Sequence, residues 1–320
     1  MKALIILNPH AGSGRALRDF EGIKSSLPKL FDAIRVAVTL DKQELGPHLV
    51  RAIEEGYDTV LVLGGDGTNL AVVNALAQFA QTPPATRDQS ALLTPLTFAS
   101  LPFGTGRDWA RTLGIPQKPA DMLRWLANAT PQPVDLGRVT IDGETQWFMN
   151  VASVGITGQI AQRVNAKPVK RPWIFLQATV GTLLRFNAPQ MRVFLDGKFW
   201  YEGDILALAV ANGRFFGRGM PVCPNAYIND GWFEVVLVEG MSKLKALTAL
   251  PTLLIGTHLE RDDVHLRRAR QVRVEGINSP LSIEMDGEPS QGQVIEFEVS
   301  PNALRMLVDM KQEALKAGFS

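Results

Sequence analysis

Three short glycine-bearing stretches have the residue types and spacing of a phosphate-binding site: "NPHAGSGRA" (8–16), "GGDGTNLAVVNAL" (64–76) and "LPFGTGRDWAR" (101–111). Glycines allow close backbone approach, and the N–H groups at the start of a following helix favour an anion. Asp66, between two of these glycines, would repel a bare phosphate. A Mg²⁺ ion between them, or a substrate hydroxyl donating to the carboxylate, would remove the repulsion, and both arrangements belong to phosphoryl transfer.

Each stretch also has a purely structural interpretation. Asp66 suits a helix N-cap, and the other two stretches suit ordinary strand-to-helix turns. The first is not a dinucleotide-binding fingerprint, because Leu17 occupies the third glycine position, and the chain contains no GxxxxGK[ST] motif. The case for a nucleotide site therefore depends on the three stretches meeting in one crevice.

The elements that would bring them together alternate between strand and helix. Largely apolar segments at 2–8, 31–40, 58–63 and 92–103 predict strands, and the segments between them have helical spacing. Such a pattern is typical of a parallel sheet covered on both faces, which binds ligands at the carboxyl ends of its strands. Because the three stretches follow three of these runs, we predict an α/β nucleotide-binding domain over residues 1–134.

After about residue 134 the pattern changes to hairpins. Asp-Gly pairs recur at 142–143, 196–197, 230–231 and 286–287, mostly between strand-like segments such as "QMRVFL", "WFEVVLVE" and "LSIEM". We therefore predict a mainly antiparallel β-sandwich domain over 135–300, interrupted by helices at 172–186 and 242–255. The remaining residues, 301–320, are expected to form a C-terminal segment that packs back on the first domain.

Composition limits the setting of this chemistry. The 320 residues are 46% hydrophobic and carry 33 Lys and Arg against 32 Asp and Glu, so no overall field recruits nucleic acid. The single cysteine, Cys223, cannot form an internal disulfide, which fits a reducing compartment. With no signal peptide and no long uninterrupted apolar run, we expect a cytoplasmic protein.

The motifs "NPHAGSG", "GGDGT", "LPFGTGRDWAR" and "MDGEP", in this order, resemble the diacylglycerol kinase catalytic family, which includes sphingosine kinases and bacterial YegS-type lipid kinases. "CPNAYINDGWFEV" (223–235) and "IEMDGEPSQG" (283–292) are similar to the second domain of the YegS-like group. The resemblance implies an ATP-dependent lipid kinase with its catalytic site between the two domains. The implied acceptor is a hydroxyl of diacylglycerol, phosphatidylglycerol or a sphingoid-type lipid, in lipid metabolism and phospholipid biosynthesis.

The resemblance also implies roles for individual residues. Asp66 and Glu288 would be catalytic, with Glu288 accepting the proton of the attacking lipid hydroxyl. Asp230 would bind Mg²⁺ or Ca²⁺ together with the backbone carbonyls of Tyr227 and Trp232, since hard cations prefer oxygen ligands. Glu288 and Asp230 also suit simple turns. The implied ATP site consists of Gly12, Ser13, Thr39, Gly64, Gly65, Asp66, Gly67, Thr68, Asn69, Gly104 and Thr105.

Two departures from the family pattern affect this site. The family usually continues GGDGT with x-Asn-Glu, where this chain has Asn69, Leu70 and Ala71. In GTxND, Arg107 replaces the asparagine. A guanidinium there either binds a phosphate or weakens the site, and the sequence leaves both open.

Access to a lipid needs a surface that contacts membranes. The segment 166–186 places Lys167, Lys170 and Arg171 before Trp173 and several apolar residues, which suits an anionic interface as well as a buried helix with a basic loop. Two other functions stay open: a soluble-substrate kinase of the NAD kinase superfamily, and a non-catalytic nucleotide- or lipid-binding protein. No nucleic-acid partner is expected, and a monomer and a homodimer are both compatible with the sequence.

Overall fold

The computed structural model describes residues 1–80, 92–166 and 172–309, which form two compact units. Unit 1 comprises Met1–Leu136, Ile228–Asp230 and the described residues from Ser300 onward. Unit 2 comprises Gly137–Tyr227 and Gly231–Val299. The predicted division between residues 134 and 135 falls inside a single strand, β5 (Thr130–Ile141), which contributes residues to both units.

Unit 1 contains the predicted parallel sheet. Its strands are β1 (Lys2–Leu7), β2 (Ala33–Val38), β3 (Thr59–Gly64) and β4 (Thr97–Pro102), paired in parallel in the order β2-β1-β3-β4. The end of β15 (Val294–Val308) adds a further parallel pairing to β4. Every residue of β3 and β4 is buried, as expected for strands covered on both faces.

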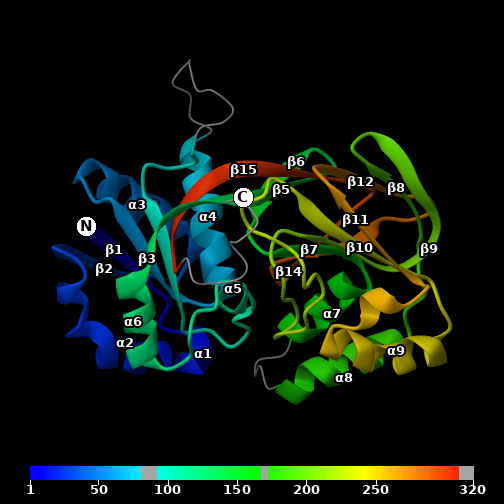
Figure 1. Cartoon of the computed structure of the whole chain (residues 1–320), viewed down its shortest axis with the longest axis horizontal. Coiled ribbons are helices and arrows are strands. Elements are labelled where there is room, and N and C mark those ends of the chain that lie inside the picture. The colour runs from blue at the N-terminus through cyan, green and yellow to red at the C-terminus, as the bar shows by residue number, and fades with distance from the viewer. Residues whose placement is uncertain (81–91, 167–171, 310–320) are drawn as a thin grey trace. The chain divides into compact units, whose positions relative to one another are not determined.

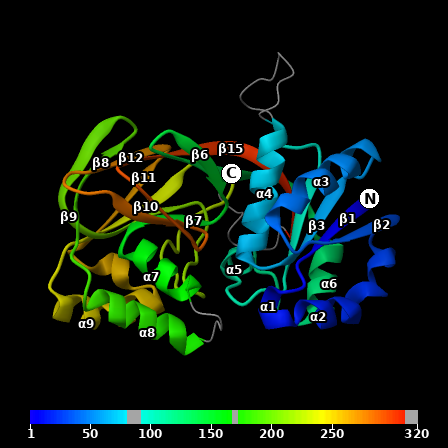
Figure 2. The same ribbon diagram turned by 180° about the vertical axis from the view of Figure 1, so that it is seen from behind.

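Helices cover both faces of this sheet (Figure 1, Figure 2), with α2 contacting α6 and α3 contacting α4. Apolar residues at helical spacing explain the cover, since Phe20 and Ile23 of α2 and Leu45 and Leu49 of α3 are buried. The helices of unit 1 are α1 (Ala11–Gly14), α2 (Ala16–Lys24), α3 (Leu45–Glu54), α4 (Asp66–Ala80), α5 (Asp108–Thr112) and α6 (Pro119–Asn128).

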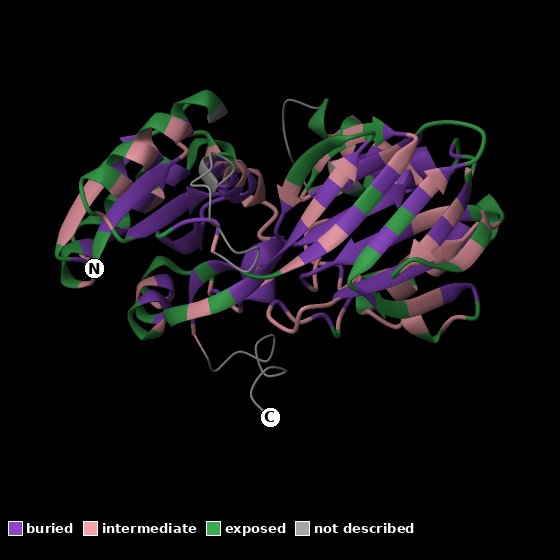
Figure 3. Cartoon of the chain, turned by 90° about the horizontal axis from the view of Figure 1, so that it is seen from above, coloured by how far each residue is buried: buried purple, intermediate pink, exposed green. Residues whose placement is uncertain are grey.

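Unit 2 is the predicted, largely antiparallel β-sandwich. One sheet consists of β6 (Glu144–Phe148), β5, β15, β12 (Gln271–Gly276), β8 (Gln190–Leu195) and the first part of β9 (Lys198–Ala211). The other consists of β14 (Glu288–Gly292), β13 (Leu281–Met285), β7 (Val151–Gly155), the second part of β9, β10 (Phe233–Glu239) and β11 (Val264–Ala269). Buried and exposed residues alternate along these strands (Figure 3), because successive side chains point to opposite faces.

An aromatic cluster joins the two sheets of the sandwich. The ring of Phe148 stacks on Phe233 at 5.6 Å between centroids and meets Phe297 edge-on at 6.2 Å. Phe148 and Phe297 belong to the first sheet and Phe233 to the second. Gly137 lies opposite Phe148 in the ladder, where an added Cβ would lie 2.1 Å from the ring. The ring of Phe148 on β6 therefore requires a residue without a side chain at the opposite position on β5.

Among the described residues, three α-helices accompany the sandwich: α7 (Ile156–Asn165), α8 (Pro172–Leu183) and α9 (Lys243–Ile255). α8 and α9 confirm the helices predicted from the apolar segments, whereas α7 was not predicted. In the described part of α8, Leu183 is buried and Leu176 is exposed. A buried helix was one interpretation of this segment, and an apolar surface for a membrane was the other, so each explains part of the helix. The three basic residues considered for contact with a membrane, Lys167, Lys170 and Arg171, lie outside the described residues.

Three of the four Asp-Gly pairs form the expected hairpin turns, with φ of 48° at Asp142, 49° at Asp196 and 48° at Asp286. The hairpin predicted at Asp230-Gly231 is wrong. β10 pairs with the preceding strand β9, but the connection between them runs over residues 212–232, so Asp230-Gly231 is not a two-residue turn between the two strands. Only Gly231 has a positive φ there, and a type I′ turn requires it at both central residues.

Candidate functional site

The three glycine loops lie against one another at the carboxyl ends of β1, β3 and β4. An added Cβ at Gly12 would lie 2.5 Å from the carbonyl oxygen of Phe103, and one at Gly104 would lie 2.4 Å from the Cα of Gly65. The N–H of Gly104 also donates to the carbonyl of Gly64 at 2.9 Å. The predicted convergence of the loops is therefore confirmed, and backbone packing explains why glycine occupies these positions.

Side chains reinforce the contact between loops. Asn8 Nδ2 donates to Thr68 Oγ1 at 3.0 Å, which links the first loop to the start of α4. Thr39 is buried, and its N–H donates to the carbonyl of Leu7 at the end of β1. Of the other predicted ATP-site residues, Gly12 is buried and Ser13 is exposed, while Gly67 and Thr105 are half-buried.

Asn69, also predicted to bind the nucleotide, has its side chain in the core of unit 1. It is 4% exposed, and its Oδ1 accepts a hydrogen bond from Ser100 Oγ of β4 at 2.9 Å. This contact ties α4 to the neighbouring strand. Its role in nucleotide binding stays a prediction.

Asp66 connects the second loop to the third. Its carboxylate accepts hydrogen bonds from the backbone N–H groups of Asp108 and Trp109, both at 3.3 Å, at the start of α5. Arg111 steadies the same turn by donating to the carbonyl of Gly106 at 2.6 Å and pairing with Asp108 at 2.9 Å. Asp66 is thus a structural cap, but of the neighbouring helix α5 rather than of α4, on which it lies. Asp108 and Arg111 were not among the predicted site residues, although both belong to the third stretch, 101–111.

The electrostatics of this edge favour an anion. Burial raises the pKa of Asp66, and the backbone N–H groups of Asp108, Trp109 and Arg107 and the charge of Arg111 oppose that rise. Burial also lowers the pKa of Arg107, and the nearby positive charges of Arg15 and Arg111 lower it further. Several guanidinium groups therefore gather where the three loops meet, beside a carboxylate that is already hydrogen-bonded.

The "MDGEP" motif of unit 2 forms the turn between β13 and β14. The carboxylate of Asp286 accepts hydrogen bonds from the backbone N–H groups of Met149, Asn150 and Val151, at 2.8, 3.1 and 3.0 Å. Glu284 accepts another from the N–H of Gly287 at 2.8 Å. Asp286, the first acidic residue of the motif, therefore stabilises the turn. Glu288, the second acidic residue, remains the candidate catalytic group of this motif.

Glu288 is the first residue of β14 and is half-buried. Asn165 at the end of α7 donates to the carbonyl of Gly287 at 2.9 Å, so the helix holds the turn from one side. The same three residue types recur at 142–144, where the Asp142 carboxylate accepts from the N–H groups of Gln293 and Val294. Glu144 there is exposed. The two turns are alike locally, and their surroundings distinguish them.

Two buried asparagines support the Asp286 turn and were not predicted from the sequence. Asn150 Nδ2 donates to the carbonyl of Phe215 at 2.7 Å, and Asn212 Nδ2 donates to that of Met149 at 2.8 Å. They are 5% and 0% exposed. A polar residue at the end of an apolar strand segment is the signal that would have identified them, because a buried amide needs a hydrogen-bond partner.

The predicted metal site depends on one carboxylate and two backbone carbonyls. Over the described ranges, no three or more His, Cys, Asp and Glu side chains form a cluster that could hold a metal ion. Next to Asp230, however, Asn229 Oδ1 is buried and has no hydrogen-bond partner among the described residues. An oxygen donor of this kind beside a carboxylate fits Mg²⁺ or Ca²⁺. The ring of Trp232 lies under Arg270 at 4.5 Å.

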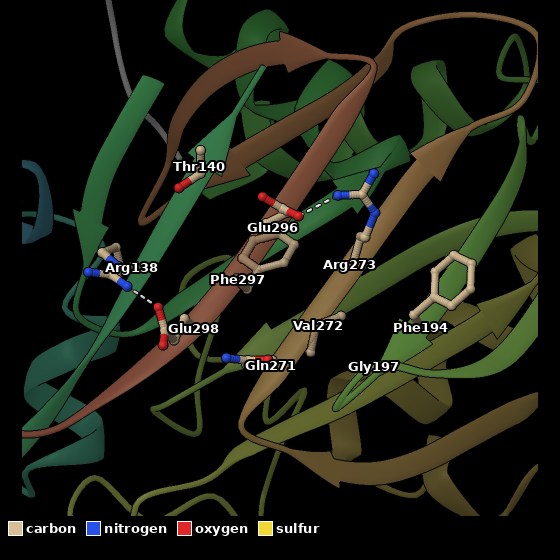
Figure 4. Close-up of a pocket in the computed structure, with 10 residues that line it drawn as sticks. All are labelled: Arg138, Thr140, Phe194, Gly197, Gln271, Val272, Arg273, Glu296, Phe297 and Glu298. Carbon is tan, nitrogen blue, oxygen red and sulfur yellow. Dashed lines mark hydrogen bonds and ion pairs between the residues drawn. The ribbon is translucent and has the colours of Figure 1, made fainter. Parts of the chain in front are cut away.

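A groove of about 450 Å³ crosses β5, β15, β12 and β8 in unit 2 (Figure 4). Arg138 pairs with Glu298 and Arg273 with Glu296, so the charges that line it already neutralise one another. None of the predicted site residues lines it. Its lining consists of Arg138, Thr140, Phe194, Gly197, Gln271, Val272, Arg273, Glu296, Phe297 and Glu298.

Comparisons with known proteins agree with this division of the chain. Residues 2–139 match the diacylglycerol kinase catalytic domain, and residues 150–308 match the YegS C-terminal NAD kinase beta sandwich-like domain. The chain is 31% identical to the "Probable lipid kinase YegS-like" of Stenotrophomonas maltophilia, over 85% of this chain and 86% of that protein. It is 30% identical to a diacylglycerol kinase of Mycobacterium tuberculosis, over 96% and 94%.

A crystal structure of a diacylglycerol kinase from Bacillus anthracis has the same fold. It superposes with a TM-score of 0.68 at 21% identity, over 97% of both chains.

Proposed function

The chain belongs to the diacylglycerol kinase catalytic family, and we propose that it transfers the γ-phosphate of ATP to a hydroxyl group of a lipid. The observation that carries the proposal is the meeting of three glycine loops around Asp66, at the carboxyl edge of the parallel sheet in unit 1. Ligands bind at this edge in α/β sheets, and the family implies use of ATP.

In the proposed reaction, the lipid oxygen forms a bond to the γ-phosphorus, and the bond from that phosphorus to the bridging oxygen of ADP breaks. The proton of the lipid hydroxyl passes to the carboxylate of Glu288. Mg²⁺, when bound, would neutralise the charge that develops on the phosphates. Asp66 would orient this ion or the hydroxyl, while its bonds to Asp108 and Trp109 hold it in place.

The proposed acceptor comes from a membrane surface that the protein contacts transiently. No helix in the described parts of the chain is long and apolar enough to span a bilayer. α9 nevertheless exposes large apolar side chains, with Leu244 74%, Leu254 52% and Ile255 72% accessible. Lys243, also exposed, begins this helix. An apolar stripe with a neighbouring cation suits an anionic bilayer interface.

The function is tested by transfer of radiolabelled γ-phosphate to a panel of acceptors. The panel contains diacylglycerol, phosphatidylglycerol and sphingosine in mixed vesicles, with NAD as the soluble acceptor and a reaction without acceptor. Labelled lipid is the expected product. Labelled NAD would support a soluble-substrate kinase instead, and no labelled product would support a non-catalytic binding protein.

Glu288→Gln separates the proposed base from a turn residue. The variant should lose at least about 100-fold in transfer to lipid with nucleotide affinity unchanged, because general base catalysis contributes on the order of 10²–10⁴-fold. Glu144→Gln is the matched control, since Glu144 follows an Asp-Gly turn of the same kind and is exposed. Equal activity of the two variants would refute the role of Glu288.

A further inference from the structure

Arg107 has a backbone conformation that its residue type does not favour. Its φ is 63°, in the left-handed region, just before α5. Four of the other described non-glycine residues with positive φ are Asp142, Asp196, Asp286 and Asn302, whose types tolerate this region. A residue held in this region at a local cost is a reason to look for a function.

The side chain of Arg107 is anchored at one end. Its Nε donates to the carbonyl of Gly104 at 3.0 Å, and Arg15 Nε donates in the same way to Gly12 at 3.1 Å. Across the described part of the chain, the terminal Nη groups of these two arginines make no hydrogen bond or ion pair. Arg111, in contrast, uses its Nη1 on the carbonyl of Gly106 and on Asp108. Two guanidinium groups with a fixed Nε therefore keep their other donors available.

The two anchors belong to loops in contact, because Gly12 packs against the carbonyl of Phe103 in the Arg107 loop. The charges are close enough to interact: Arg15 and Arg111 add to burial in lowering the pKa of Arg107, and Asp19 opposes this. Positive charges close to the half-buried guanidinium of Arg107 are unfavourable, and a bound anion would relieve this repulsion. Guanidinium groups are particularly suited to phosphate, which they bind through paired N–H donors.

We propose that Arg107, together with Arg15, binds the phosphate chain of the nucleotide donor. The identity of the ligand as a nucleotide rests on the proposed function. The inference gives a role to Arg107, the residue that departs from the family pattern. Where the family usually has the neutral amide of asparagine, this chain places a cation. Arg107 acts in this proposal as a phosphate-binding residue and transfers no proton.

Equilibrium binding of inorganic tripolyphosphate, ATP, ADP and adenosine to the full-length protein tests the proposal without any lipid. Arg107→Asn should weaken binding of the three phosphate compounds about 10-fold or more, as expected for loss of a hydrogen bond between charged groups. Adenosine binding should not change. Asparagine tolerates a positive φ, so the melting temperature should not fall, and any loss of binding then reflects the ligand contact. Arg107→Lys keeps the charge and should lose less.

The control is Arg124→Asn, because Arg124 is 74% exposed on α6, pairs with Asp121 and belongs to none of the three glycine loops. Unchanged tripolyphosphate affinity in Arg107→Asn, or an equal loss in Arg124→Asn, would overturn the proposal, as would failure of the parent protein to bind tripolyphosphate. Binding that depends on Arg107 in a protein that phosphorylates no lipid would uphold this inference and refute the kinase. Transfer of phosphate to lipid, with binding that does not depend on Arg107, would uphold the kinase function and refute this inference.

Discussion

Replacing Gly106 by alanine perturbs Asp66 without changing any functional group. A Cβ at Gly106 would lie 2.7 Å from Asp66 Oδ2, whereas ordinary contact begins at 3.4 Å, so the two atoms must separate by about 0.7 Å. The carboxylate cannot simply turn away, because it holds the N–H groups of Asp108 and Trp109 at 3.3 Å. Either these hydrogen bonds lengthen or the start of α5 moves.

Both responses have an estimable size. Overpacking of this kind costs about 1–3 kcal/mol of unfolding free energy. A displacement approaching 1 Å at a catalytic group costs on the order of 10²-fold in rate. We therefore expect Gly106→Ala to lose about 10- to 100-fold in phosphate transfer, with a melting temperature lower by several degrees.

Gly22→Ala is the matched control. Gly22 lies inside α2, and an added Cβ there meets nothing within 4 Å. This variant should keep full activity and gain about 0.5–1 kcal/mol, since alanine favours a helix over glycine. The measurements are initial rates of γ-phosphate transfer and thermal unfolding of both variants. Gly106→Ala with the rate of Gly22→Ala would refute the idea that the position of Asp66 governs catalysis.

Two further predictions concern a metal ion and pH. Asp230→Ala should reduce the increase in melting temperature that added Mg²⁺ or Ca²⁺ produces, because a ligand that binds only the folded state stabilises it, and an unchanged increase would exclude Asp230 as a ligand. Arg261 and Lys245 hold the pKa of Asp263 at about 2, below its ordinary 3.8, so the charged form contributes about 2 kcal/mol of stability. In urea unfolding, Asp263→Asn should be less stable than the parent by this amount at neutral pH. The difference should shrink as pH falls from about 4 towards 2, and a pH-independent difference would contradict the assignment.

The sequence alone determined the architecture of both units. Uninterrupted apolar runs such as Thr59–Gly64 bury on both faces and predict parallel strands, and this pattern is local in the chain. Asp-Gly pairs likewise predicted three hairpins, because the turn depends on two adjacent residues. The exception, Asp230-Gly231, shows the limit of the rule, since the pair lies within the long connection 212–232 between the paired strands β9 and β10 and does not itself form their turn.

The tertiary structure decided which residues of each motif do structural work and which stay available for chemistry. Asp66, which the sequence suggested as catalytic, and Asp286, which it placed in a hairpin turn, both accept backbone N–H groups from segments far along the chain. Glu144 and Glu288 follow the same two residue types, and contacts such as that of Asn165 at the end of α7 distinguish the second turn. Hydrogen bonds and burial are set by segments that meet only in the folded chain, so motif and spacing give a residue's neighbours in sequence but not its partners in space.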